Sequence, residues 1–149
     1  IMADPDPVFY LPAYEYIEIY NKTDFNISLS GWSLIAGTTT RTISAYTLKP
    51  KSYLILCSEA AYPYLKEYGY THIVSGFPAL TNSGQSLILK NKQGSIISTV
   101  AFQDSWYKNS LKSEGGWSLE QIDPENPCGG EKFVIHFTYI VFSPVRGAE

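Results

Sequence analysis

The stretch "QSLILKNKQGSIISTVAF", residues 85–102, holds two apolar runs joined by a short polar connection. In the first run Leu87 and Leu89 fall on one face, because side chains along a strand point alternately to opposite sides. The connection "NKQG" supplies a glycine that can take the positive φ of a tight hairpin turn. The stretch therefore predicts a β-hairpin and indicates a protein built from short strands.

Further segments on both sides of the hairpin carry strand patterns. They are "YEYIEIYN" (14–21), "GWSLIAG" (31–37), "SYLILCS" (52–58) and "GWSLEQI" (116–122). The third is apolar on both faces, which predicts a central strand covered on both sides. Many short strands separated by turn residues indicate an all-β sandwich or barrel.

One segment predicts a helix. "SEAAYPYLKEYG", residues 58–69, begins at Ser58, which suits an N-cap, and ends at Gly69, which suits the position after a helix. Pro63 cannot lie deep inside a helix, so the predicted helix is limited to a turn or two.

The first strand pattern argues against a catalytic carboxylate pair. Ile17 and Ile19 share one face with Glu15, whereas Glu18 lies on the other face with the tyrosines. The two glutamates therefore point in opposite directions and cannot flank one glycosidic bond. The isoleucine face is expected in the core, and the amphipathic tyrosine face is a candidate binding surface. Its members are Tyr14, Tyr16 and Tyr20.

Length and composition narrow the class of protein. A chain of 149 residues with 44% hydrophobic residues suits one domain with a real core. Eleven Lys and Arg against 14 Asp and Glu give a net charge of −3, so nucleic acid is an unfavourable partner. The longest apolar run, "FVIHFTYIVF" (133–142), is too short to span a bilayer as a helix, so no transmembrane segment is expected.

The tail from residue 133 to residue 142 has mainly apolar side chains on both faces of an extended chain, and this pattern predicts a strand. An exposed strand of this kind tends to pair with another chain, so we expect it to complete a sheet. The sheet belongs either to this chain or to a neighbouring copy, which leaves a homo-oligomer open.

Residues that could carry chemistry are few. His72 and His136 lie far apart, and the metalloprotease, phosphate-loop and serine-hydrolase motifs are absent from the sequence. The sequence therefore predicts a protein that is not an enzyme and needs no cofactor. Aspartate before proline is ordinary turn chemistry, which is favoured over a calcium site. The carboxylates of that minority alternative are Asp4, Asp6, Glu15 and Asp104.

Two other features leave alternatives open. Trp106 and Tyr107 lie in the expected loop "DSWYKNS" (104–110), where they plug the end of the sandwich or, as a second choice, bind a ligand. Cys57 and Cys128 lack the spacing of a metal site. They are either two buried thiols or one disulfide, and the disulfide would imply an oxidising compartment.

Four segments in this order resemble the lamin tail domain family. They are "EYIEIYN" (15–21), "LSGWSL" (29–34), "LKPKSYLILCS" (48–58) and "LTNSGQSLILKNKQGSIISTVAF" (80–102). "IMADP" (1–5), "DSWY" (104–107) and "GGWSLEQIDPENPC" (115–128) are similar to the bacterial, secreted or envelope-associated branch. The resemblance covers residues 1–130, beginning within the first strand of the family pattern, and residues 131–149 depart from it.

The resemblance implies an immunoglobulin-like β-sandwich. It also implies a non-catalytic interaction or tethering module of a secreted or cell-envelope bacterial protein, with a protein or a glycan as ligand. It favours the disulfide between Cys57 and Cys128. The alternatives are a carbohydrate- or calcium-dependent adhesin module and a structural subunit that associates through its C-terminal strand.

Overall fold

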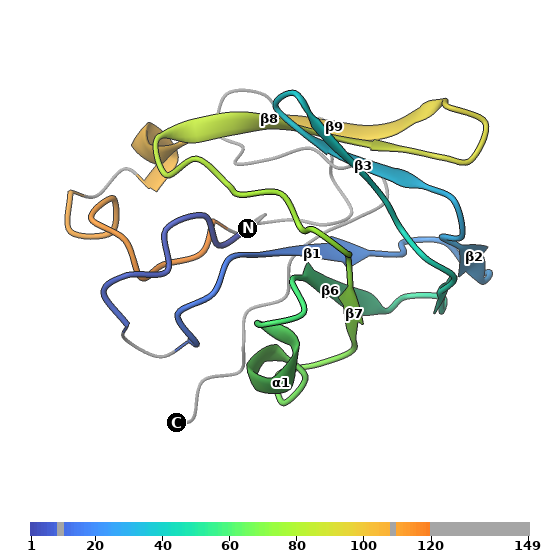
Figure 1. Cartoon of the computed structure of the whole chain (residues 1–149), viewed down its shortest axis with the longest axis horizontal. Coiled ribbons are helices and arrows are strands. Elements are labelled where there is room, and N and C mark those ends of the chain that lie inside the picture. The colour runs from blue at the N-terminus through green and yellow to red at the C-terminus, as the bar shows by residue number, and fades with distance from the viewer. Residues whose placement is uncertain (9–10, 108–109, 120–149) are drawn as a thin grey trace.

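The computed structural model describes residues 1–8, 11–107 and 110–119 (Figure 1). Its strands are β1 (Tyr16–Tyr20), β2 (Ile27–Ser28), β3 (Ser33–Ala36), β4 (Thr39–Thr42), β5 (Thr47–Leu48), β6 (Tyr53–Cys57), β7 (Thr71–Ile73), β8 (Gly84–Lys90) and β9 (Ile96–Gln103). The helical elements are α1 (Tyr62–Leu65) and the 3₁₀ helix η1 (Asp104–Tyr107). In the described ranges no helix is long and apolar enough to cross a membrane.

Two sheets form the layers of a sandwich. The larger has the order β4-β3-β8-β9 and the smaller has the order β1-β6-β7, while β2 and β5 pair separately. Figure 1 shows the larger sheet lying across the smaller one, with α1 on the far side of the smaller sheet. The expected all-β sandwich with one short helix is therefore confirmed.

The core lies between the two sheets and follows the predicted alternation. Ile17 and Ile19 of β1 face Leu87 and Leu89 of β8 within one cluster, and all four side chains are buried. Burial of each such side chain stabilises the fold by roughly 1.5–3 kcal/mol before entropy is counted. The isoleucine face of the first strand is the core face, as its parity predicts.

The predicted hairpin is confirmed as the pair β8–β9. The Oδ1 atom of Asn91 accepts hydrogen bonds from the backbone N–H groups of Gln93, at 3.0 Å, and Ser95, at 2.9 Å. Gly94 has a φ of +83°, which is the left-handed conformation that the turn requires.

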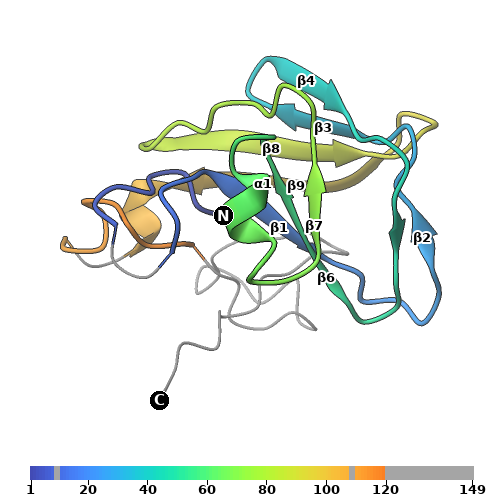
Figure 2. The same ribbon diagram turned by 60° about the horizontal axis from the view of Figure 1, so that its bottom comes forward.

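Strand β6 is covered on both sides, as its sequence predicts. Leu54 and Leu56 enter the core between the sheets, whereas Ile55 and Cys57 face a second cluster on the other side. Figure 2, seen from the α1 side, shows this helix lying over the smaller sheet. Leu65 of α1 closes the second cluster and is buried.

The helix prediction is correct in place but wrong in extent. α1 begins at Tyr62 with Ala61 as its N-cap, and the hydroxyl of Ser58 instead accepts a hydrogen bond from the Ala61 N–H at 3.2 Å. Pro63 stands in the first turn, where its missing N–H costs nothing. The helix ends with Lys66 as its C-cap, before Gly69.

The strand expected over residues 116–122 is wrong for its described part. Residues 116–119 have no strand assignment. Leu119 instead exchanges two backbone hydrogen bonds with Ile1, at 2.8 and 2.9 Å. Residues 120–149 lie outside the described residues, so the expected strand over 133–142 and the domain boundary at residue 130 stay predictions.

Candidate functional site

The N-terminal segment and the start of β1 enclose a pocket of about 470 Å³ at one end of the sandwich, which we call the acidic pocket. Its lining consists of Ala3, Asp4, Pro5, Asp6, Ala13, Tyr14, Glu15, Ser58, Phe77, Ala79 and Asn82. The N–H of Gly116 donates to the carbonyl of Asp4 at 2.7 Å and so holds the segment in place. The pocket therefore depends on residues from four distant parts of the chain.

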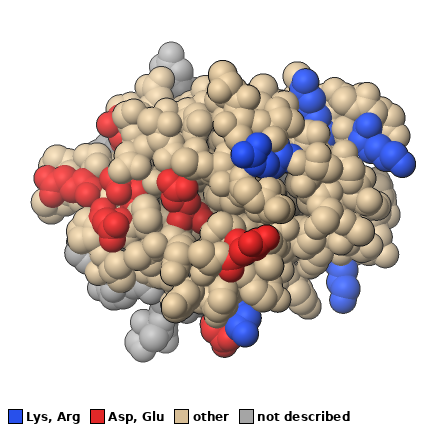
Figure 3. Space-filling model, viewed as in Figure 1, with Lys and Arg blue, Asp and Glu red and all other residues tan. Residues whose placement is uncertain are grey.

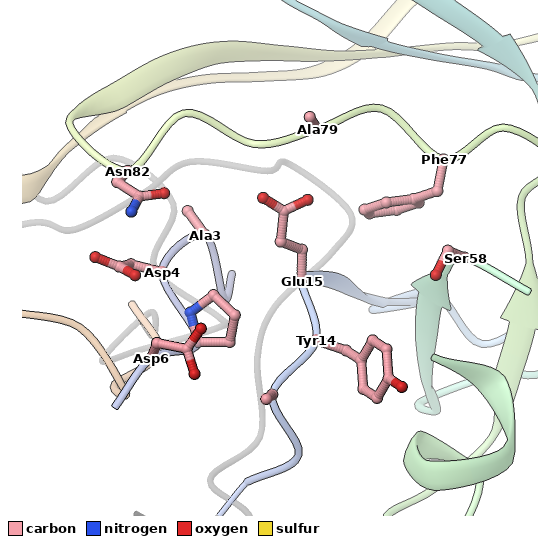
Figure 4. A pocket seen from close by; sticks show the side chains of 11 residues that line it. Ala3, Asp4, Asp6, Tyr14, Glu15, Ser58, Phe77, Ala79 and Asn82 are labelled. Carbon is pink, nitrogen blue, oxygen red and sulfur yellow. The ribbon is translucent and has the colours of Figure 1, made fainter. Parts of the chain in front are cut away.

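Three carboxylates line the acidic pocket (Figure 4). Asp4 and Asp6 stand on one side, and Glu15 rises between them and the aromatic side. The Oε1 atom of Glu15 accepts a hydrogen bond from the Leu80 N–H at 3.2 Å. Burial raises the pKa of Glu15, and the bond from Leu80 partly opposes that rise. Glu15 is therefore the carboxylate that the fold holds most firmly.

The Glu15→Gln variant is expected to become more stable than the native chain as the pH rises above about 4.5, which is the ordinary pKa of a glutamate side chain. A raised pKa in the folded state means that stability is fully present at low pH and is lost as Glu15 ionises. Glutamine does not ionise and keeps the oxygen that accepts from Leu80. Solvent screening should keep the effect below about 1 kcal/mol.

Urea unfolding at several pH values measures this difference. The matched control is Glu67→Gln, since Glu67 lies on the exposed surface. A Glu15→Gln advantage that shrinks as the pH rises would contradict the assignment of Glu15 as a partly desolvated acid.

Aromatic side chains form the opposite wall of the acidic pocket. Phe77 packs against the core, and Tyr14 stands on the same side of the pocket (Figure 4). The Tyr14 ring stacks on Tyr64 of α1, with 5.1 Å between centroids and 24° between planes. Tyr64 is 54% exposed, so the stack forms a rim that a ligand can reach.

The other tyrosines of the first strand are covered. Tyr16 and Tyr20 are only 7% and 8% exposed. Tyr16 belongs to the second cluster beneath α1, and the Tyr20 ring lies 4.5 Å from that of Tyr53. The tyrosine face is therefore mostly buried, and Tyr14 alone of the three reaches the pocket.

Trp106 and Tyr107 lie on η1 rather than in a loop. Both pack against the core between the sheets and are partly buried. The hydroxyl of Tyr107 donates to the Trp117 carbonyl at 2.6 Å. Burial, with a smaller contribution from Asp4, raises the pKa of Tyr107 to about 12. This placement agrees with the interpretation that the two aromatic side chains plug the end of the sandwich.

The positions of the carboxylates give little support to the alternative of a calcium site. Asp4, Asp6 and Glu15 share the pocket, but Asp104 is not part of its lining. Among residues 1–8, 11–107 and 110–119, no three His, Cys, Asp or Glu side chains form a group that could hold a metal ion.

Cys57 is buried in β6, and burial raises the pKa of its thiol to about 11. Cys128 lies outside the described residues. The disulfide between them stays a prediction.

A second pocket of about 370 Å³ holds a serine and a histidine side by side. The Oγ of Ser44 lies 3.0 Å from the Nε2 of His72. Burial lowers the pKa of His72, and a hydrogen bond with the Ser44 backbone partly opposes this. Within the described residues no carboxylate lines this pocket, so the pair lacks the third group that orients a catalytic histidine.

Sequence patterns missed three residues of the site, namely Tyr64, Phe77 and Asn82. The run "AYPYLKEYGY" (61–70) carried a usable signal for Tyr64, because a segment this short cannot bury all four of its tyrosines. Phe77 and Asn82 lie in an irregular connection without a pattern. Figure 3 adds that acidic side chains gather toward one end of the molecule and basic side chains mainly toward the other.

Comparison with protein families gives a match over most of the chain. The model described as Lamin Tail Domain matches residues 1–104. The comparison with curated proteins finds no match.

Proposed function

This chain belongs to the lamin tail domain family, and from that premise we propose that it tethers its parent protein to a partner through the acidic pocket and its tyrosine rim. The family is one of immunoglobulin-like, non-enzymatic domains for protein interaction. A fold of this kind hosts many functions, so the surface has to specify the role.

The observation that carries the proposal is the exposed stack of Tyr14 and Tyr64 beside three carboxylates. Tyrosine offers a large apolar face and a polar hydroxyl at little entropic cost, which is why it is enriched at interfaces. Stacking holds Tyr64 in place although it is 54% exposed. A partner would therefore meet a surface that is already ordered.

The charge of the pocket favours a basic partner. Lysine and arginine carry long apolar stems that pack on aromatic rings while their charged heads reach carboxylates. Tyr14 and Phe77 offer such rings on one side, and Asp4 and Asp6 offer the charges on the other (Figure 4). We therefore propose that the partner is a protein that inserts a Lys or Arg side chain from an extended segment.

A titration followed by nuclear magnetic resonance tests this proposal. The probes are a short peptide rich in arginine and the same peptide with glutamate in place of arginine. The amide signals of Asp4, Glu15 and Asn82 are expected to shift only with the arginine peptide. Added salt should weaken the shifts, because exposed charges are screened.

Replacing Tyr64 with serine should weaken that binding about threefold to tenfold, since one ring of the rim is lost. The matched control is Phe25→Ser, because Phe25 is 65% exposed in the turn before β2. Equal effects of the two variants, or equal shifts with both peptides, would refute the proposal. Shifts produced by calcium chloride alone, or by a neutral oligosaccharide alone, would replace it with the adhesin alternative.

We propose a secreted or cell-envelope bacterial protein as the parent. What supports this is the likeness of "IMADP", "DSWY" and "GGWSLEQIDPENPC" to that branch of the family. An oxidising compartment would also suit a disulfide between Cys57 and Cys128. A thiol assay tests this on protein isolated from its native source and then denatured. Two free thiols in that assay would count against an oxidising compartment.

A further inference from the structure

Strand β9 is the outer strand of the larger sheet and, with eight residues, the longest strand described. The N–H of Asp104 donates to the Ser83 carbonyl at 3.2 Å, just beyond the pair Gly84 and Gln103. Hydrogen-bonded and non-hydrogen-bonded pairs alternate along an antiparallel ladder. The backbone groups of Thr99, Ala101 and Gln103 therefore point away from β8, along an edge where no strand of the described residues pairs with β9.

This edge lacks the features that normally prevent pairing with another chain. Residues 95–103 contain no charged residue and no proline. The opposite edge of the same sheet, β4, is shorter and carries Arg41, whose Nε donates to the Gly76 carbonyl at 2.6 Å. In the smaller sheet β7 has three residues, and Met2 bridges Tyr16 at the outer side of β1.

We propose that β9 pairs with β9 of a second copy of this chain, antiparallel and around a two-fold axis, to form one continuous sheet. In this register Ala101 lies opposite Ala101 of the second copy, and Thr99 lies opposite Gln103. All these residues direct their backbone groups outward, as the ladder requires. The small alanine side chains let the strands approach, and the threonine hydroxyl meets the glutamine amide.

The charges beside β9 favour this partner over a different protein. Lys90 and Lys92 flank the hairpin turn at the start of β9, and Asp104 follows its end. Antiparallel pairing places the basic end of each copy beside the acidic end of the other, so the oppositely charged ends attract twice. Figures 1 and 3 show the same arrangement on a larger scale, with β9 running between the basic and the acidic end of the molecule. A two-fold interface of this kind closes on itself.

Sedimentation equilibrium of the full chain tests the proposal by comparing the native chain with the variant Ala101→Lys, since Ala101 is exposed on β9. The native chain is expected to form dimers that weaken with added salt. Because Ala101 lies opposite Ala101 of the second copy, this variant places two lysines directly opposite each other at the centre of the interface and should raise the dimer dissociation constant about 100-fold. Thr40→Lys on β4 is the matched control, because it adds the same exposed charge to the opposite edge of the same sheet.

Three results would overturn the proposal. They are a native chain that is monomeric up to its solubility limit, a dimer that Ala101→Lys leaves intact, and equal weakening by the two lysine variants. If Ala101→Lys fails to fold, hydrogen exchange of the native chain decides instead. The amides of Ala101 and Gln103 should then exchange more slowly as the protein concentration rises, and unchanged rates would refute the pairing.

Discussion

Replacing Asn21 with alanine is expected to lower the free energy of unfolding by about 3 kcal/mol. Asn21 follows β1 and is fully buried. Its Nδ2 donates to the carbonyls of Phe25, Leu48 and Lys49 at 2.8, 3.2 and 3.0 Å. Its Oδ1 accepts from the Thr23 N–H at 3.0 Å. Alanine would remove all of these hydrogen bonds, and the Phe25 and Lys49 carbonyls would keep only the hydroxyls of Thr23 and Ser52. Losing hydrogen bonds from buried polar groups is expensive.

Thermal and urea unfolding measure this loss. Asn26→Ala is the matched control, because Asn26 lies in the same turn region but is exposed. Its effect should stay within about 0.5 kcal/mol. If Asn21→Ala were as mild as Asn26→Ala, the turn after β1 would not depend on this side chain, contrary to the hydrogen bonds that it makes.

Replacing Gly115 with alanine is expected to lower the free energy of unfolding by about 2–4 kcal/mol and to open the acidic pocket. Gly115 has a φ of +103°, which strains any residue with a side chain. A methyl group there would overlap the Asp6 carbonyl oxygen and lie 2.9 Å from the Asp4 carboxyl carbon. The chain can relieve the overlap only by moving Asp4 and Asp6 away from residues 115 and 116.

The matched control is Gly94→Ala in the β8–β9 turn. Gly94 has a φ of +83°, but a methyl group there meets nothing within 4 Å. Gly94→Ala should lower the free energy of unfolding only by the cost of holding an alanine at a positive φ, about 1–2 kcal/mol. The two variants could lose similar free energies of unfolding while the amide signals of Asp4 and Asp6 stay unchanged in Gly115→Ala. That result would show that residues 115 and 116 do not hold Asp4 and Asp6 in place.

The parts of the fold set by local periodicity could be predicted from the sequence. The β8–β9 hairpin follows from alternation and one glycine, and the double coverage of β6 follows from its continuous apolar run. Parity also places Ile17 and Ile19 in the core. These features depend on neighbours in the chain, which a sequence displays directly.

Features that depend on packing between distant elements could not be predicted. Tyr16 is buried because α1 and its cluster cover that face of the smaller sheet, and parity alone contains no information on what lies opposite. The acidic pocket brings residue 4 beside residues 15 and 82, and no spacing in the sequence indicates that approach. The helix begins late because Pro63 fits its first turn better than its second.

The pairing of Ile1 with Leu119 bears on how the protein is made. The two residues are 118 positions apart, yet each supplies backbone groups to the other. A ribosome synthesises the chain from its N-terminal end. Ile1 can therefore form its hydrogen bonds with Leu119 only after almost the whole domain has been synthesised. The hairpin and both sheets can form during that time, because all of their described strands are complete by residue 103. Among the described parts of the chain, the acidic pocket is then the last to be assembled, because the contact between Gly116 and Asp4 forms only after residue 116 has left the exit tunnel.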